Sequence, residues 1–127
     1  MEINDITRQI IVSSIKVHSI LGAGLMETIY EKVLAYELRK AGLDVKQQVA
    51  IPVKYENILM EIGFRVDLLV EESVIVEIKS VESVHPLHKK QVLTYLKLTN
   101  NRIGLLINFN QELLKNGITR LFNKHVK

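Results

Sequence analysis

The chain has 127 residues, 47% hydrophobic and 24% charged, which is long enough for one domain with a buried core. It contains no cysteine, so disulfides, thiolate zinc sites and a cysteine nucleophile are excluded. No window approaches the roughly 20 apolar residues of a membrane span, and the N-terminus lacks a basic leader with a long apolar run. We therefore expect a cytoplasmic protein with no membrane partner.

The net charge of +3 is distributed unevenly. Residues 1–78 carry eight Lys/Arg and twelve Asp/Glu, a balance of −4, whereas residues 79–127 carry nine and two, a balance of +7. A basic half of this kind attracts a phosphate backbone, although a solvated basic surface explains any single one of its residues equally well.

Two helices are predicted at the N-terminus. Asp5 is a candidate N-cap for a helix that ends near residue 21, and a glycine-rich break at 22–24 precedes a second helix over about 25–41. Glu27 lies in the first turn of the second helix, with Tyr30 one turn on along the same face. On composition alone, the favoured role of Glu27 is a structural one, in which its negative charge interacts with the helix dipole.

Residues 43–54 and 58–62 are predicted to form strands joined by a turn at 55–57. Pro52 has no N–H to donate to a ladder, which indicates that the first of these strands lies at the edge of a sheet.

Residues 64–70 and 74–80 are predicted to form a β-hairpin around a three-residue loop. This register gives one wholly apolar face, with the pairs Val66–Ile78, Leu68–Val76 and Val70–Val74. The other face then contains the pairs Arg65–Lys79, Asp67–Glu77 and Leu69–Ile75. A two-residue loop is the poorer alternative, because it separates the two carboxylates and mixes charged with apolar side chains.

The opposed carboxylates of Asp67 and Glu77 would have Cβ atoms about 4.5–5.5 Å apart, a distance at which like charges destabilise a sheet. Such a pair requires a cation or a shared proton. Two carboxylates beside Lys79 suit Mg²⁺-dependent cleavage of a phosphodiester. The same spacing also arises by chance in a strand whose outer face is simply charged.

A third helix is predicted over 86–98, since proline suits its first turn. His88, Gln91 and Tyr95 share one of its faces, and Gln91 is a candidate to lie over the acidic pair, although a polar helix surface explains this face equally well. Zinc is not expected, because His85 and His88 have no evident third ligand.

The apolar run 103–109 predicts a strand buried on both faces and parallel to a neighbour through the preceding helix. A short helix over 110–116 and a strand over 118–122 complete the chain. The order of elements predicts a single α/β domain over 1–127, with a mixed central β-sheet flanked by helices.

Two groups of residues carry a family resemblance. Asp67, Glu77 and Lys79, on a hairpin followed by a helix, resemble the core motif of the PD-(D/E)XK nuclease superfamily, and the stretch from Gly24 to Tyr30, GLMETIY, is similar to the signature of its GxxExxY family. Further similarity is found at Gly22–Leu25, Arg65–Val70, Gln91 with Tyr95, and Gly104–Phe109. The chain departs from the superfamily motif at Val66, where the motif has proline.

This resemblance implies a nuclease that uses Mg²⁺ (or Mn²⁺) and acts on nucleic acid, with DNA preferred, and it leaves room for a homodimer. Asp67 and Glu77 would be metal ligands, Lys79 an electrostatic catalyst and Gln91 a site organiser. Glu27, approaching from the second helix, would be a further ligand or a water-orienting base. Contacts with nucleic acid are expected from Tyr30, Lys89, Lys90, Tyr95, Lys97, Arg120 and Lys124.

Two other functions fit the sequence. One is a nucleic-acid-binding or assembly module that keeps the fold without turnover. The other is a metal-dependent hydrolase of small phosphoesters, which would require an enclosed pocket.

Overall fold

The computed structural model describes residues 1–126, except for the side chain of Ile62. Its elements are α1 (Ile3–Leu21), α2 (Glu27–Lys40), β1 (Val45–Tyr55), β2 (Ile58–Val70), β3 (Val74–Lys79), α3 (Pro86–Thr99), β4 (Ile103–Asn108), a 3₁₀ turn η1 (Leu114–Gly117) and β5 (Ile118–Phe122). The described helices include none that is long and apolar enough to span a membrane.

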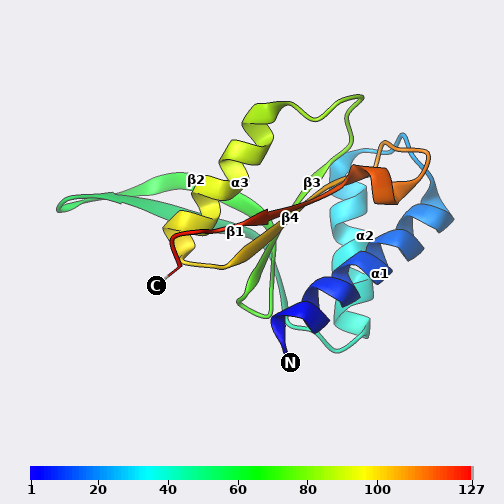
Figure 1. The fold of residues 1–127 in the computed structure, drawn as a ribbon, viewed down its shortest axis with the longest axis horizontal. Coiled ribbons are helices and arrows are strands. Elements are labelled where there is room, and N and C mark those ends of the chain that lie inside the picture. Colours follow the sequence, from blue (N-terminus) through cyan, green and yellow to red (C-terminus); the bar gives the residue numbers. More distant parts are fainter. Residues whose placement is uncertain (127) are drawn as a thin grey trace.

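The five strands form one sheet in the order β1-β2-β3-β4-β5 (Figure 1). β3 and β4 are parallel, and the other neighbouring strands are antiparallel. The parallel pair requires a crossover, which α3 supplies between β3 and β4. The predicted α/β domain with a mixed central sheet is therefore confirmed.

Helices cover both faces of the sheet. On one face, residues of α1 and α2 such as Ile10 and Leu34 pack against alternate strand residues, including Leu105. On the other face, Leu96 of α3 packs against Leu106. β4 is buried on both faces, as its almost continuous apolar sequence predicted.

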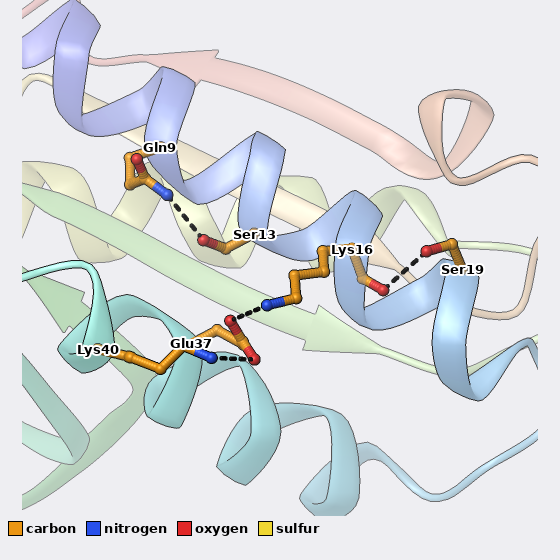
Figure 2. Close-up of polar contacts among 6 residues, drawn as sticks. All are labelled: Gln9, Ser13, Lys16, Ser19, Glu37 and Lys40. Atoms are coloured by element: carbon orange, nitrogen blue, oxygen red, sulfur yellow. Dashed lines mark hydrogen bonds and ion pairs between the residues drawn. The ribbon is translucent and has the colours of Figure 1, made fainter.

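α1 and α2 also make polar contacts near the surface (Figure 2). The Lys16 ammonium donates a hydrogen bond to the Glu37 carboxylate at 3.0 Å, and Lys40 lies 3.7 Å from the same carboxylate. The hydrogen bond raises the pKa of Lys16 and lowers that of Glu37. Because the lysines of these ion pairs are exposed to solvent, the apolar core holds the two helices together more than the ion pairs do.

The β1–β2 hairpin is longer than predicted and extends away from the body of the molecule (Figure 1). β2 continues through Gly63, where two separate strands were predicted. A Cβ atom at Gly63 would lie 1.8 Å from the Ile51 carbonyl oxygen, so the close approach of β1 requires glycine there. Pro52 lies on the edge strand β1, as predicted.

The predicted helix over 110–116 is wrong, since only the 3₁₀ turn forms in that region. A tertiary contact uses a backbone group that a helix would need, because the His18 ring bonds the Gln111 carbonyl at 2.6 Å. The Asn108 side chain also accepts a hydrogen bond from the Asn110 N–H at 3.2 Å, which is a local contact at the start of this segment. Similarly, Asp5 is not the cap of α1 but lies in its first turn.

A candidate active site between two strands and two helices

The β2–β3 ladder contains the pairs Leu68–Val76, Leu69–Ile75 and Val70–Val74, which confirms the register of the three-residue loop. The ladder ends at Leu68, however, so the prediction that Asp67 and Glu77 form a regular backbone pair is wrong. The next residues are joined through their side chains instead.

Each of the two carboxylates accepts a hydrogen bond from the backbone of the opposite strand. The Asp67 N–H donates to Glu77 Oε1 at 2.9 Å, and the Ile78 N–H donates to Asp67 Oδ2 at 2.8 Å. These bonds satisfy two N–H groups that the interrupted ladder would otherwise leave unpaired. Asp67 and Glu77 are thus neighbours across the two strands. They lie in a gap in the backbone ladder, where their side chains take the place of backbone pairing.

The apolar face of the hairpin also changes at this gap. Val66 was predicted to share a face with Leu68, but it packs with Ile75 and Tyr95 on the α3 side of the sheet. Leu68 packs on the opposite side, against α1 and α2. The alternation of β2 therefore shifts at Asp67, where pairing with β3 stops.

The environment of the pair disfavours two negative charges. Burial, followed by the charge of Asp67, raises the pKa of Glu77 from its ordinary 4.5 to about 8. Burial is also the largest cause of the raised pKa of Asp67. At neutral pH the metal-free pair therefore holds a proton that a divalent cation would displace.

A third carboxylate acts on this pair from α2. Glu31 is buried, accepts hydrogen bonds from the side-chain amides of Gln47 at 3.1 Å and Gln48 at 2.5 Å, and its charge raises the pKa of both Asp67 and Glu77. Glu31 was not among the residues predicted from the sequence. The available signal was its position one turn beyond Glu27 on the same helix face.

Gln48 links the two acidic groups. Its amide nitrogen donates both to Glu31 and, at 3.2 Å, to Asp67 Oδ1. The backbone of Gln48 has a φ of 52°, a left-handed conformation that costs free energy in a non-glycine residue. No feature of the sequence indicated this conformation.

Glu27 lies beside the end of β3. Its Oε2 accepts a hydrogen bond from the Ser80 N–H at 3.1 Å, and the Ser80 hydroxyl donates to the Leu25 carbonyl at 2.6 Å. The loop before α2 is thereby fastened next to Lys79. Glu27 does come from the second helix, as predicted, but Glu31 is the α2 carboxylate whose charge acts on Asp67.

Tyr30 is completely buried, so it has no surface with which to contact nucleic acid, and its predicted role is corrected. Its hydroxyl donates to the Gly22 carbonyl at 2.6 Å and accepts from the Leu25 N–H at 3.1 Å, while its ring stacks on Phe109 at 4.5 Å. Tyr30 thus fixes the glycine-rich loop that leads into α2.

Lys79 ends β3, in register with Asn108 of β4. Its charge lowers the pKa of Asp67 and of Glu77, opposing the effect of burial. Within residues 1–126, no ion pair of 4.0 Å or less joins Lys79 to either carboxylate. The ammonium therefore acts on the site through its field rather than as a fixed partner.

One face of α3 borders the site. The charges of Glu77 and Asp67 raise the pKa of Tyr95, and the charge of Lys79 lowers that of His88, in each case after the effect of burial. Gln91 lies between these two residues on the helix and is half-buried. Tyr95 is only 7% exposed, so it offers nucleic acid little surface.

The predicted basic contacts fall on two sides of the molecule. Lys89, Lys90 and Lys97 are exposed on α3, and Lys97 lines a groove together with Lys124. Arg120 instead lines a cavity with residues of α1, on the opposite face of the sheet. The five side chains therefore do not form one continuous surface.

Comparison with known proteins identifies the class to which this fold and site correspond. A family model described as the PD-(D/E)XK nuclease superfamily matches residues 4–121. The chain belongs to this superfamily, which implies a nuclease-like function and a nucleic-acid substrate. Neither the curated proteins nor the solved structures contain a match.

Nucleases of this superfamily generally use divalent metal ions. In the described part of the chain, no three His, Asp or Glu side chains lie close enough together to hold one. Mg²⁺, however, is commonly held by one or two carboxylates together with water and substrate phosphate. Asp67 and Glu77 fit such a two-carboxylate site, because both offer oxygen and a cation would relieve their mutual repulsion.

Proposed function

We propose that this protein is a Mg²⁺- or Mn²⁺-dependent nuclease of the GxxExxY type that hydrolyses phosphodiester bonds in DNA. The observation that carries the proposal is the crossed arrangement of Asp67 and Glu77, which places two carboxylates with raised pKa values beside Lys79. Formation of a homodimer stays a prediction.

The roles of the residues follow from their positions. A divalent ion, when bound, supplies positive charge that activates water and neutralises phosphate. Asp67 and Glu77 would hold it, and Lys79 would stabilise charge developing on the phosphate. Glu27, fixed by Ser80, would orient water or add a ligand, and Gln91 would organise the site from α3.

The test is a cleavage assay on linear, branched and single-stranded DNA and RNA, with Mg²⁺ or Mn²⁺ and with EDTA as the control. We expect metal-dependent cleavage that is lost in Asp67→Asn and in Glu77→Gln. Wild-type protein that cleaves none of these substrates with either metal contradicts the proposal.

The alternative is a non-catalytic nucleic-acid-binding module that keeps the same fold. If the wild-type protein binds nucleic acid with a clear salt dependence but cleaves nothing, the non-catalytic module is the better assignment.

A further inference from the structure

A groove outside the acidic site lies between the C-terminal half of α3 and the segment that follows β5. Its volume is about 390 Å³, within the usual range of about 300–1,000 Å³ for small-molecule sites. Leu93 and Lys97 line it from α3, Phe122 lines it from the end of β5, and Lys124 and His125 line it from the segment that follows.

The C-terminal wall of the groove is fixed by one residue. The Asn123 N–H donates to the Arg102 carbonyl at 2.9 Å, and its side-chain amide donates to the carbonyls of Leu96 at 3.2 Å and Asn101 at 3.0 Å. Its side-chain oxygen accepts from the His125 N–H at 2.9 Å. The groove therefore has its shape before any ligand binds, which lowers the entropic cost of binding.

An aromatic ring in the groove is largely open to solvent. Phe122 is 57% exposed, and Leu93, across the groove, is 39% exposed. An exposed phenyl ring on a fixed strand end is a platform on which a nucleobase can stack, an interaction of about 1–3 kcal/mol per base.

The charge of the groove is positive. Lys97 and Lys124 are both exposed, and no acidic side chain is among the described residues that line the groove. The matching ligand carries negative charge next to a planar apolar group. That combination is the chemistry of a nucleotide, with phosphate at the lysines and base at the ring.

We propose that this groove binds one nucleotide of a single-stranded segment, with the base on Phe122 and the phosphates near Lys97 and Lys124. This proposal rests on the proposed function for its substrate class, nucleic acid, and narrows that class to single-stranded segments. A base within a duplex is covered on both faces by its neighbours and cannot reach Phe122 without unstacking. The preferred substrate is therefore nucleic acid with an unpaired stretch.

The binding test uses full-length protein in EDTA, so that cleavage plays no part. The probes are a labelled single-stranded DNA oligonucleotide and a blunt duplex that contains the same sequence. Phe122→Ala should weaken single-strand binding by about 5- to 150-fold, the fold-change that corresponds to about 1–3 kcal/mol of stacking. Duplex binding should not change. Equal single-strand affinity of Phe122→Ala and wild type would overturn the proposal.

Tyr36 provides the matched control. It is an aromatic residue, 61% exposed on α2, with the Lys40 ammonium 5.5 Å from its ring centroid, but α2 covers the opposite face of the sheet. Tyr36→Ala should leave both affinities unchanged. A loss as large as that of Phe122→Ala would mean that any exposed aromatic ring suffices, and the groove assignment would fail.

Two further measurements do not depend on removing the phenyl ring. The chain has no tryptophan, so Phe122→Trp introduces a single fluorescent reporter, which single strands should quench and duplex should not. Lys97→Gln and Lys124→Gln should each reduce the salt slope of single-strand binding by about 0.7 for every phosphate that the lysine neutralises. Absence of both effects overturns the proposal.

Two last outcomes are informative. The first distinguishes a free mononucleotide from a nucleic-acid strand as the ligand, and the second distinguishes failure of the nuclease function from failure of the groove assignment. If free nucleoside monophosphate quenches Phe122→Trp with the same dissociation constant as the strand, the groove is a mononucleotide site and the single-strand assignment is wrong. If Phe122-dependent binding is found without cleavage by any metal, the proposed nuclease function fails while the groove assignment stands.

Discussion

The chemistry of the site depends on how each acidic side chain is held. Asp67 and Glu77 accept backbone hydrogen bonds that fix their positions, yet burial raises the pKa of each above its ordinary value. The charge of Asp67 raises the pKa of Glu77 further, and the charge of Glu31 raises the pKa of both. Gln48 compensates in part, because its amide donates to Asp67 and to Glu31. In the proposed function, a bound cation would offset the shortage of positive charge at this site.

The raised pKa of Glu77 predicts how the stability of the metal-free protein depends on pH. Between its ordinary pKa of 4.5 and its folded-state pKa of about 8, the folded protein retains a proton that the unfolded chain releases. The free energy of unfolding should therefore decrease as pH rises from 4.5 to 8. Denaturant unfolding in EDTA at several pH values measures this slope.

Glu77→Gln is the control for that slope. The amide oxygen of the glutamine can still accept the Asp67 N–H, but the group no longer titrates. The variant should be more stable than wild type at about pH 8, the folded-state pKa of Glu77, and should lose most of the decrease. Parallel profiles for the two proteins would contradict the assigned pKa.

A divalent ion should stabilise the folded protein. Binding to the native carboxylate pair alone raises the free energy of unfolding by about 2.7 kcal/mol at an ion concentration of about 100 times Kd. Asp67→Asn should remove this effect and, by removing one like charge, stabilise the metal-free protein. Melting curves with and without Mg²⁺ test both statements, and a wild-type Tm indifferent to millimolar Mg²⁺ would favour a simply solvated acidic face.

At the scale of elements, the start of α2 shows how a helix is positioned for chemistry. The loop before it needs positive φ at Gly22 and Gly24, and the buried Tyr30 hydroxyl closes that loop from within. Glu27 is the first residue of the helix, so its direction follows from the loop. Most of the GLMETIY stretch therefore has a structural role. Tyr30 holds the loop in place, and the loop in turn sets the position of Glu27.

Tyr30→Phe tests this positioning. It would leave the Gly22 carbonyl and the Leu25 N–H without their partner, which costs about 1–3 kcal/mol of stability, while the stacking on Phe109 is kept. We expect a lower midpoint of unfolding, with little change in nucleic-acid affinity. Tyr36→Phe, at an exposed ring, should change neither, and a Tyr30→Phe variant as stable as wild type would show that the loop does not need the hydroxyl.

The sequence predicted most element types, because their patterns are local. The apolar run of β4 and the proline at the start of α3 depend on neighbouring residues alone. The short helix over 110–116 failed because a distant residue, His18, bonds the Gln111 carbonyl that a helix would use for its own hydrogen bonds. Local propensity cannot show such contacts.

For the site, spacing predicted which carboxylates meet but not how they meet. The three-residue loop brought Asp67 near Glu77, whereas the ladder ends at Leu68 and the two side chains bond the opposite backbone instead. Asp67 also accepts a hydrogen bond from Gln48, a residue of another strand. Glu31 was missed because a buried glutamate near a helix N-terminus looks, in one sequence, like an ordinary surface residue. Tyr30 was assigned to nucleic acid because sequence does not give burial.

At the scale of the whole molecule, the acidic residues proposed for catalysis and the basic residues proposed for nucleic-acid binding come from different parts of the chain. The acidic group comes from α2, β2 and β3, while the second half of the chain carries +7. Lys79 lies at the junction of these regions, where it influences Asp67 and Glu77, whereas Lys89 and Lys90 are exposed on α3 and take part in none of the described ion pairs. Substitution of Lys79 should therefore affect cleavage, whereas substitution of Lys89 or Lys90 should affect binding.

Lys79 is proposed to act on charge that develops in the transition state, whereas Lys90 would meet phosphate that is charged already in the ground state. Lys79→Ala should reduce the cleavage rate by about 10²- to 10³-fold, the scale of losing one preorganised electrostatic group, with nearly unchanged affinity. Lys90→Ala should instead weaken binding and lower the salt slope by about 0.7–0.9 for every phosphate that the lysine neutralises. Single-turnover cleavage and equilibrium binding, measured on the same substrate, distinguish the two patterns. If Lys79→Ala weakens affinity as much as it slows cleavage, Lys79 is a ground-state phosphate contact and not an electrostatic catalyst.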